Sequence, residues 1–229
     1  MEVVSLYIFA YLVGAIPAAY IIGKTVKGVD IRGYGSGNVG STNVFHHVGR
    51  KWAVSLGGLE VLVKGALPVW IALYVLDWDR SSAVLIGPAL LAVAGHNWSI
   101  FLKFQGGRGL AVATGTLLGL SPILLGAFVV VSIGGWSVTR SSGVWVLISL
   151  ALLPVWSVIA GEPANITFFS LGLVLLIVLK RLFSNWTPLP EGLPKGKVLF
   201  NRLFRDRDVD DKAEWVRRVP QGTNSGEVR

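Results

Sequence analysis

The sequence predicts an all-α membrane protein: a polytopic bundle of about seven transmembrane helices, with the N-terminus outside and the C-terminus in the cytoplasm. Three observations lead to this fold class. Hydrophobic residues make up 52% of the 229 residues, and charged residues make up only 15%. The charges are also unevenly placed, because the last fifty residues hold 11 of the 21 Lys and Arg. An ordinary soluble domain is less apolar than this.

Apolar runs of suitable length supply the spans. About 20 apolar residues cross a hydrocarbon core of about 30 Å. The first run has no basic segment before it and does not end in a cleavage site of small residues, so we interpret it as a span and not as a signal peptide. The clear candidates are residues 3–23, 53–76, 83–102, 143–160 and 165–179.

The uncharged run 109–138 is too long for one comfortable span, because about thirty helical residues extend roughly 45 Å. Pro122 lies in its middle, and proline disfavours helical backbone at the residue before it. We therefore divide the run into two short spans at 109–120 and 122–138, which brings the total to seven.

Charge then orients the expected bundle. The loop 24–52 carries five Lys and Arg, so the positive-inside rule places it in the cytoplasm. With seven spans, cytoplasmic segments hold 19 of the 21 Lys and Arg. Residues 1–182 are expected to form the bundle. Residues 183–229 are expected to form a basic cytoplasmic tail, partly irregular, with a short helix around Trp215 on the membrane surface.

Two charges lie inside the second expected span. Glu60 and Lys64 are one helical turn apart, with the acid before the base. Charges at that depth are costly and usually paired. A structural pair facing the bundle is the first interpretation, and a proton or substrate path is the second.

Composition also limits the function. The chain has no cysteine, and its three histidines lack clustered carboxylates, so neither a metal site nor a cofactor is expected. The net charge of +8 is concentrated beside apolar spans. This placement fits anionic lipid headgroups better than nucleic acid. Membrane lipids are therefore expected partners, and nucleic acid is not.

The first cytoplasmic loop is rich in glycine and in hydroxyl or amide side chains. Residues 33–43 contain four glycines, and Ser36, Asn38, Thr42 and Asn43 lie between or after them. Such a segment can turn backbone N–H groups toward an anion, and the side chains add further donors. The pattern indicates a phosphate cradle, although glycine-rich segments between spans are often simple turns.

A second cytoplasmic loop strengthens this interpretation. Gly95-His96-Asn97 closes one span, and Gln105-Gly106-Gly107-Arg108-Gly109 opens the next. Glycines before a helix N-terminus, with a guanidinium among them, favour anion binding. The segments 139–142 and 200–208 would lie on the same side and add further cations, although 200–208 is also typical of a solvated basic helix on the headgroups.

The two loops resemble those of the bacterial acyl-phosphate-dependent glycerol-3-phosphate acyltransferases, a family of small seven-span inner-membrane enzymes. The matching segments are 35–44, 95–97 and 104–109, and with the spans between them the resemblance covers about residues 1–145. In the tail, Arg202-Leu203 with Asp208 is similar to the family's third motif, an Arg-Leu pair with a downstream Glu.

The resemblance implies an enzyme of the bacterial inner membrane whose site faces the cytoplasm. It would move a fatty acyl group from acyl phosphate to the sn-1 hydroxyl of glycerol 3-phosphate, giving lysophosphatidic acid for phospholipid synthesis. Acyl phosphate is already activated, so positioning and charge neutralisation would be the main work. Substrate phosphate or His96 would accept the hydroxyl proton. Association with the enzyme that makes acyl phosphate stays open.

The same resemblance implies the site residues. Ser36, His96 and Arg108 are the expected catalytic residues. The expected substrate-binding residues lie in the two loops, in the segment 139–142 and in the tail: Gly35, Gly37, Asn38, Gly40, Thr42, Asn43, His46, Gly106, Gly107, Gly109, Arg140, Ser142 and Arg202.

Some motif positions differ from the family. His46 stands where the family has arginine, Gln105 and Arg108 stand where it usually has lysines, and Leu199 stands where its third motif has asparagine. Two alternatives therefore stay open. One is a divergent relative with another acyl acceptor or no activity. The other is a transporter of a phospholipid or phosphate ester, which an inverted internal repeat would favour; we find none in the sequence.

Overall fold

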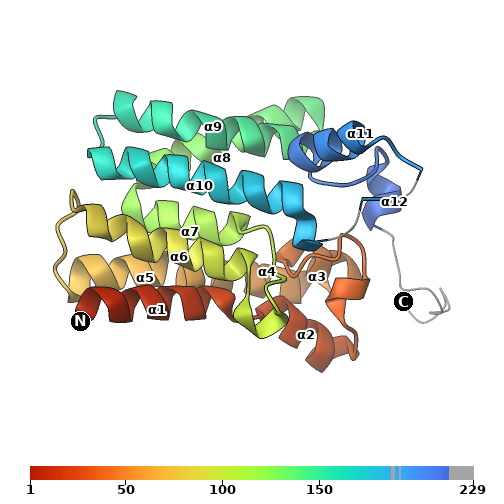
Figure 1. The fold of residues 1–229 in the computed structure, drawn as a ribbon, viewed down its shortest axis with the longest axis horizontal. Coiled ribbons are helices and arrows are strands. Elements are labelled where there is room, and N and C mark those ends of the chain that lie inside the picture. The colour runs from red at the N-terminus through yellow and green to blue at the C-terminus, as the bar shows by residue number, and fades with distance from the viewer. Residues whose placement is uncertain (187–188, 191, 217–229) are drawn as a thin grey trace.

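The computed structural model of the chain describes residues 1–186, 189–190 and 192–216, and the regular elements in this part are all helical. Figure 1 shows the long helices lying side by side in a bundle. In chain order the elements are α1 (Glu2–Ala15), α2 (Ala18–Lys27), η1 (Ile31–Gly33), α3 (Ser41–His47), α4 (Arg50–Leu59), η2 (Glu60–Ala66), α5 (Leu67–Trp70), η3 (Ile71–Val75), η4 (Ala83–Leu85), α6 (Ile86–Asn97), η5 (Ile100–Leu102), α7 (Leu110–Leu120), α8 (Pro122–Thr139), α9 (Ser142–Ile159), α10 (Ala164–Phe183), η6 (Ser184–Trp186), α11 (Lys195–Phe200), η7 (Asn201–Arg205) and α12 (Lys212–Val216).

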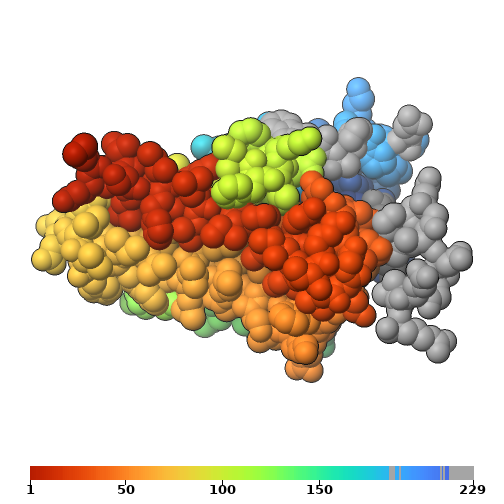
Figure 2. Space-filling view, turned by 90° about the horizontal axis from the view of Figure 1, so that it is seen from below, coloured from red at the N-terminus to blue at the C-terminus, as the bar shows by residue number. Residues whose placement is uncertain are grey.

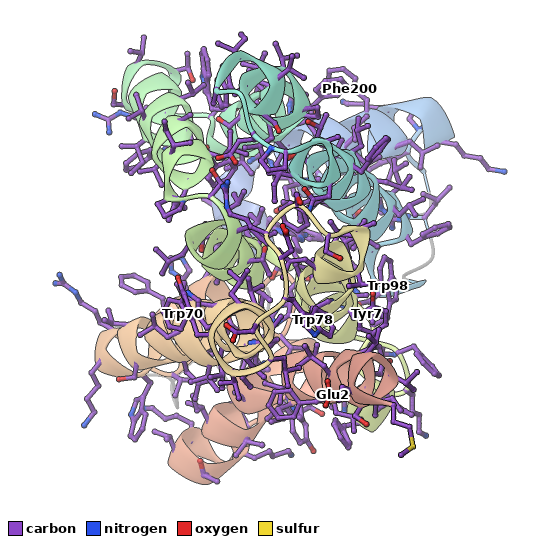
Figure 3. The ribbon with its side chains drawn as sticks, turned by 90° about the vertical axis from the view of Figure 1, so that its left-hand side faces the viewer. Glu2, Tyr7, Trp70, Trp78, Trp98 and Phe200 are labelled. Carbon is purple, nitrogen blue, oxygen red and sulfur yellow. The ribbon has the colours of Figure 1, made fainter. Side chains whose placement is uncertain are left out.

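Length and apolar composition qualify five of the described helical stretches to cross a membrane, and two further apolar helices are shorter. Large apolar side chains project outward all round the bundle, as the view along its long axis shows (Figure 3). The five long stretches are 2–27, 50–75, 122–139, 142–159 and 164–183, and the shorter helices are 83–97 and 110–120.

The helix break predicted at Pro122 is present. Helix α7 ends at Leu120 and α8 begins at Pro122, whose missing N–H costs nothing at the first helical position. The hydroxyl of Ser121 caps α8 by accepting a hydrogen bond from the Leu124 amide at 3.3 Å. The long uncharged run is therefore two helices, as its length indicated.

A second break lies in the first apolar run, for which the sequence predicts one span over 3–23. Helix α1 ends at Ala15 and α2 begins at Ala18, because Pro17 has no amide to continue the helix and restricts the residue before it. The Ile16 carbonyl at the break accepts hydrogen bonds from the Ala18 amide at 2.9 Å and from the Lys64 ammonium at 2.5 Å. A buried cation from the second span thus satisfies the broken end of the first.

Glycines bring pairs of helices into close contact. A Cβ on Gly115 of α7 would lie 2.0 Å from the Val61 carbonyl oxygen of η2, and one on Gly14 of α1 would lie 2.2 Å from the Ala92 carbonyl oxygen of α6. Small residues at such contacts let backbones approach and increase van der Waals packing, which drives helix association in membranes. These contacts fix the helices that carry the two glycine-rich loops.

The two ends of the bundle differ in character (Figure 1). At the end that holds the N-terminus, Arg80 forms an ion pair with Glu162, and the Ser121 hydroxyl donates to the same carboxylate. At the other end, α2, α3, α11 and α12 gather around the ends of the long helices. In the space-filling view the yellow-green loop after α6 lies beside the red and orange N-terminal segments (Figure 2). The glycine-rich loops therefore meet at one end.

Candidate functional site

A cavity of about 440 Å³ opens at the end of the bundle where these loops gather. Its wall is built from the first glycine-rich loop, from η2 and α6, from the start of α7 and of α9, from the end of α10, and from the segment 205–216. Residues far apart in the sequence thus share one polar hollow at the end of an apolar bundle.

The first glycine-rich loop is folded around the side chain of Asn43. The Asn43 amide donates hydrogen bonds to the carbonyls of Ile31 and Tyr34 at 2.9 Å and to that of Asn38 at 3.2 Å. Gly35 has a φ of 51°, and a Cβ there would lie 2.5 Å from the Asn43 amide oxygen. Only glycine fits that position, because its backbone is left-handed and a neighbouring side chain fills the space.

The second loop packs against the end of α6. The Gly107 amide donates to the His96 carbonyl at 3.1 Å. A Cβ on Gly107 would lie 2.1 Å from the His96 ring nitrogen Nε2, so the loop backbone rests directly on the imidazole. Asn185, after α10, accepts from the Gly106 amide and donates to the Gly106 carbonyl, both at 3.0 Å. The loop is therefore held from both sides.

The loop then leads into a helix N-terminus at the cavity. Gly109, with a φ of 70°, precedes the first residue of α7, and Gly109, Leu110 and Ala111 all line the cavity. The first amides of a helix have no intrahelical acceptor and point outward with the positive end of the helix dipole. This arrangement favours an anion, as the sequence indicated.

The two loops contact one another through Asn38 and Arg108. With the Asn38 amide oriented so that its oxygen faces the guanidinium, that oxygen accepts from Arg108 Nε at 2.7 Å and Nη2 at 2.9 Å. The two segments therefore converge on one site, which is the arrangement an anion shared between them requires.

A carboxylate from the tail completes a charged cluster with two arginines. Asp206 forms an ion pair with Arg108 and lies 3.6 Å from Nε of Arg181, measured to Oδ1. Arg205 and Arg207 also line the cavity, so four arginines face it. Burial, together with the charge of Arg205, lowers the pKa of the Arg207 guanidinium.

A buried acid lies behind the imidazole. Glu60 and His96 are 2% and 7% exposed, and Glu60 Oε1 lies 3.6 Å from His96 Nδ1. The other carboxylate oxygen accepts from the Ser41 hydroxyl at 3.3 Å. All three residues line the cavity. Oε1 itself has no hydrogen-bond partner among the described residues, so the carboxylate lies beside the ring nitrogen without bonding it. A negative charge beside an imidazole is the pairing found between an acid or base residue and its partner.

Comparison with known proteins agrees with this geometry. The family model described as glycerol-3-phosphate acyltransferase matches residues 4–189. The chain belongs to the glycerol-3-phosphate acyltransferase family. It is accordingly an acyltransferase enzyme and a membrane protein.

Relatives named glycerol-3-phosphate acyltransferase are similar to this chain over most of its length. Glycerol-3-phosphate acyltransferase 4 of Dehalococcoides mccartyi (strain CBDB1) is 34% identical over 216 residues, covering 91% of this chain and 90% of the relative. The enzyme of Desulforudis audaxviator is 37% identical over 176 residues, covering 75% of this chain and 84% of the relative.

A solved structure is similar as well. The crystal structure of PlsY, an integral membrane glycerol 3-phosphate acyltransferase, in its glycerol 3-phosphate form is 33% identical to this chain. It superposes with a TM-score of 0.73 and covers 79% of this chain and 88% of PlsY. The lysophosphatidic acid form of PlsY gives a TM-score of 0.71 at 31% identity.

Most site residues expected from the acyltransferase loops line the cavity, and six do not. Gly35 and Gly37 shape the first loop, and Gly106 and Gly107 lie behind His96 at a second, smaller hollow. Arg140 is exposed and lies 5.9 Å above the Trp136 ring. The expected residues on the cavity wall are Ser36, Asn38, Gly40, Thr42, Asn43, His46, His96, Arg108, Gly109 and Ser142.

Arg202, the remaining one of the six, is buried away from the cavity. It pairs with Asp208 at 2.5 Å and donates to the Leu182 carbonyl at 3.2 Å. Both residues lie beyond the part matched by the family model. Another Arg-Leu pair, Arg181-Leu182, lies inside the matched range, and its guanidinium reaches the cavity.

Sequence reasoning overlooked several groups at this site. Arg181 belongs to a second Arg-Leu pair in an apolar span, which was a readable signal. The helical spacing pairs Glu60 with Lys64, whereas in the fold the Lys64 ammonium donates to the Ile16 carbonyl, and Glu60 accepts from Ser41 and lies 3.6 Å from His96. Among the described residues, no three His, Cys, Asp or Glu side chains gather as metal ligands.

Proposed function

We propose that this acyltransferase moves a fatty acyl group from acyl phosphate to the sn-1 hydroxyl of glycerol 3-phosphate. The hydroxyl oxygen attacks the acyl carbonyl carbon, a new C–O ester bond forms, and the C–O bond to phosphate breaks. The hydroxyl proton passes to His96 or to the departing phosphate, phosphate leaves with the bonding electron pair, and lysophosphatidic acid is the other product. No covalent enzyme intermediate is required, because the donor is a mixed anhydride.

One observation carries the proposal: two glycine-rich loops and four arginines surround a single cavity at one end of an apolar bundle. Both substrates are phosphate esters or anhydrides, and backbone amides with guanidinium groups bind phosphate through charge-assisted hydrogen bonds. In this proposal the catalytic residues are Ser36, His96 and Arg108. Cations near the leaving phosphate would stabilise the charge that develops on it.

The proposal includes a topology. The bundle crosses the bacterial inner membrane seven times, and the cavity faces the cytoplasm. Its support is the placement of basic residues, since the positive-inside rule assigns the end with loop 24–52 to the cytoplasm. Glycerol 3-phosphate then enters from water, and the acyl chain lies among the helices.

The test uses purified protein in lipid nanodiscs with acyl phosphate and glycerol 3-phosphate. Wild type is expected to release lysophosphatidic acid and inorganic phosphate in equal amounts. Arg108→Met is expected to lose most activity, and Arg50→Met, which removes the same charge from an exposed position outside the cavity, is expected to keep it.

Two results would overturn the proposal. One is an absence of ester product with every glycerol phosphate acceptor tried. The other is flux of a phosphorylated lipid across liposomes without phosphate release, which would make the protein a transporter. Acceptor competition with labelled donor separates a relative that uses another acceptor.

A further inference from the structure

Asp206 occupies a position between two guanidinium groups on the cavity wall. Arg108 Nη1 contacts both the carboxylate and the main-chain carbonyl of Asp206. On the other side, Arg181 Nε lies 3.6 Å from Asp206 Oδ1. Both arginines and the aspartate line the same cavity. A negative group of the protein therefore lies where two cations converge.

This contact leaves hydrogen-bonding capacity unused. Arg181 is 3% exposed, and its Nη1 donates to the carbonyls of Gly143 and Leu203 at 3.0 and 2.7 Å. Its Nη2 and the Oδ1 of Asp206 are buried without a hydrogen-bond partner among the described residues. An unsatisfied buried donor is costly, more so when it is charged. A group with more acceptor oxygens than a carboxylate would satisfy Arg181 better.

Phosphate has that chemistry. It is tetrahedral, carries up to two negative charges near neutral pH, and offers three or more acceptor oxygens. Arg108 also bonds Asn38 in the first glycine-rich loop, so an anion held by these arginines would touch both loops. Glu60 is the other carboxylate among the described residues of the cavity wall, and its neighbours there are Ser41 and His96 rather than the two arginines.

The backbone conformation of Asp206 itself helps to place its side chain. Asp206 follows η7 with a φ of 59°, in the left-handed region, and so turns the chain toward the cavity. Aspartate and asparagine tolerate this region better than most residues. The residue lies outside the range 4–189 matched by the family model, so the feature belongs to the tail of this chain.

We propose that Asp206 is an internal anion that holds Arg108 and Arg181 in position and is displaced when a substrate phosphate enters the cavity. It thereby sets the affinity of the site for phosphate-bearing ligands. The inference rests on the proposed function in one respect, the assignment of this cavity to substrate phosphate. The phosphate and the Asp206 carboxylate compete for the same two arginines. The apparent affinity for phosphate is therefore lower when a larger fraction of the molecules has the arginines bound to Asp206.

The test compares Asp206→Asn with wild type in nanodiscs, using inorganic phosphate as the probe in equilibrium binding. Asparagine keeps the left-handed backbone and the size but removes the charge. We expect phosphate to bind roughly tenfold more tightly, which corresponds to a competent fraction of about one tenth in wild type. KM for glycerol 3-phosphate is expected to fall as well.

A matched control is Asp30→Asn, which makes the same substitution in an aspartate–arginine ion pair elsewhere in the chain. Asp30 pairs with Arg32, and neither residue lines the cavity. This variant is expected to bind phosphate as wild type does. If Asp206→Asn does not fold, Asp206→Gly removes the carboxylate while still allowing the positive φ.

Unchanged or weaker phosphate binding by a folded Asp206 variant would overturn the inference, because it would give the carboxylate only a structural role. The binding assay is independent of acyl transfer. Failure of the acyl-phosphate reaction would therefore contradict the proposed function without changing the phosphate-binding result. A failure of the proposed function and a failure of this inference can thus be distinguished.

Discussion

Replacing Gly107 by alanine tests whether the contact between the second loop and the imidazole matters for catalysis. The new Cβ would lie 2.1 Å from His96 Nε2, whereas an ordinary contact begins at 3.4 Å, so one of the two groups must move by about 1.3 Å. The Val39 carbonyl oxygen, 2.8 Å from the same Cβ, is a second clash, and the hydrogen bonds between Gly106 and Asn185 oppose a shift of the loop. The imidazole would therefore be displaced from its place at the cavity wall.

A misplacement of about 1 Å in a catalytic site costs roughly a hundredfold in rate, or about 2.7 kcal/mol of transition-state stabilisation. We expect Gly107→Ala to lose at least that much kcat/KM in the acyl-phosphate assay, while its thermal unfolding in detergent shows a folded protein. Gly58→Ala is the control, because a Cβ there meets nothing within 4 Å. A Gly107→Ala enzyme within twofold of wild type would refute the geometric argument.

Three further changes test other parts of the structure. Glu60→Gln is expected to lower kcat about a hundredfold with little change in KM, because it removes the negative charge 3.6 Å from the His96 ring. Gly115→Leu is expected to yield no monodisperse protein, since a Cβ there lies 2.0 Å from a carbonyl oxygen of η2. Asp30→Asn is expected to lower Tm at pH 7, by an amount that shrinks as the pH falls below the ordinary Asp pKa of about 3.9, because the hydrogen bonds from Arg32 lower the pKa of the Asp30 carboxyl in the folded state.

The sign of the pH effect follows from the direction of the shift. A carboxyl with a lowered folded pKa stabilises the protein above its unfolded pKa, and this contribution disappears as the pH falls through the folded value. A Tm difference between Asp30→Asn and wild type that persists in acid would contradict the assignment. For the other two changes, recovery of kcat by Glu60→Asp and normal folding of Gly126→Leu, where a Cβ meets nothing within 4 Å, are the expected controls.

The helices and the meeting of the two loops could be predicted from the sequence, because both depend on local signals. A long apolar run interrupted by Pro122 specifies two helices through the missing amide alone. The same rule applied at Pro17, where the apolar run continues on both sides and concealed the break. The apolar composition of a segment indicates that it can cross a membrane, but it does not show where the helix is interrupted, because a single proline decides that.

The charged cluster could not be predicted, because its members are neighbours only in the folded chain. Nothing around Asp206 in the sequence indicates that it meets Arg108 rather than the many nearer basic residues of the tail. Glu60 was misleading for a similar reason: its nearest charge along the helix is Lys64, yet the bundle supplies Ser41 and His96 from other elements. The spacing of residues in the sequence indicates which side chains can meet on one helix. Which side chains meet between helices depends on how the helices pack.

Helix α7 has a consequence for the insulation of the membrane. It has 11 residues, or about 16 Å of helix, roughly half the thickness of the hydrocarbon core. Its first residue lines the cavity, and the carbonyl of its last residue accepts hydrogen bonds from Arg80 at the opposite end of the bundle. In the proposed topology the dielectric barrier between the two aqueous sides would therefore be thin along this path, and buried apolar side chains such as Leu117 would have to exclude water and ions from it.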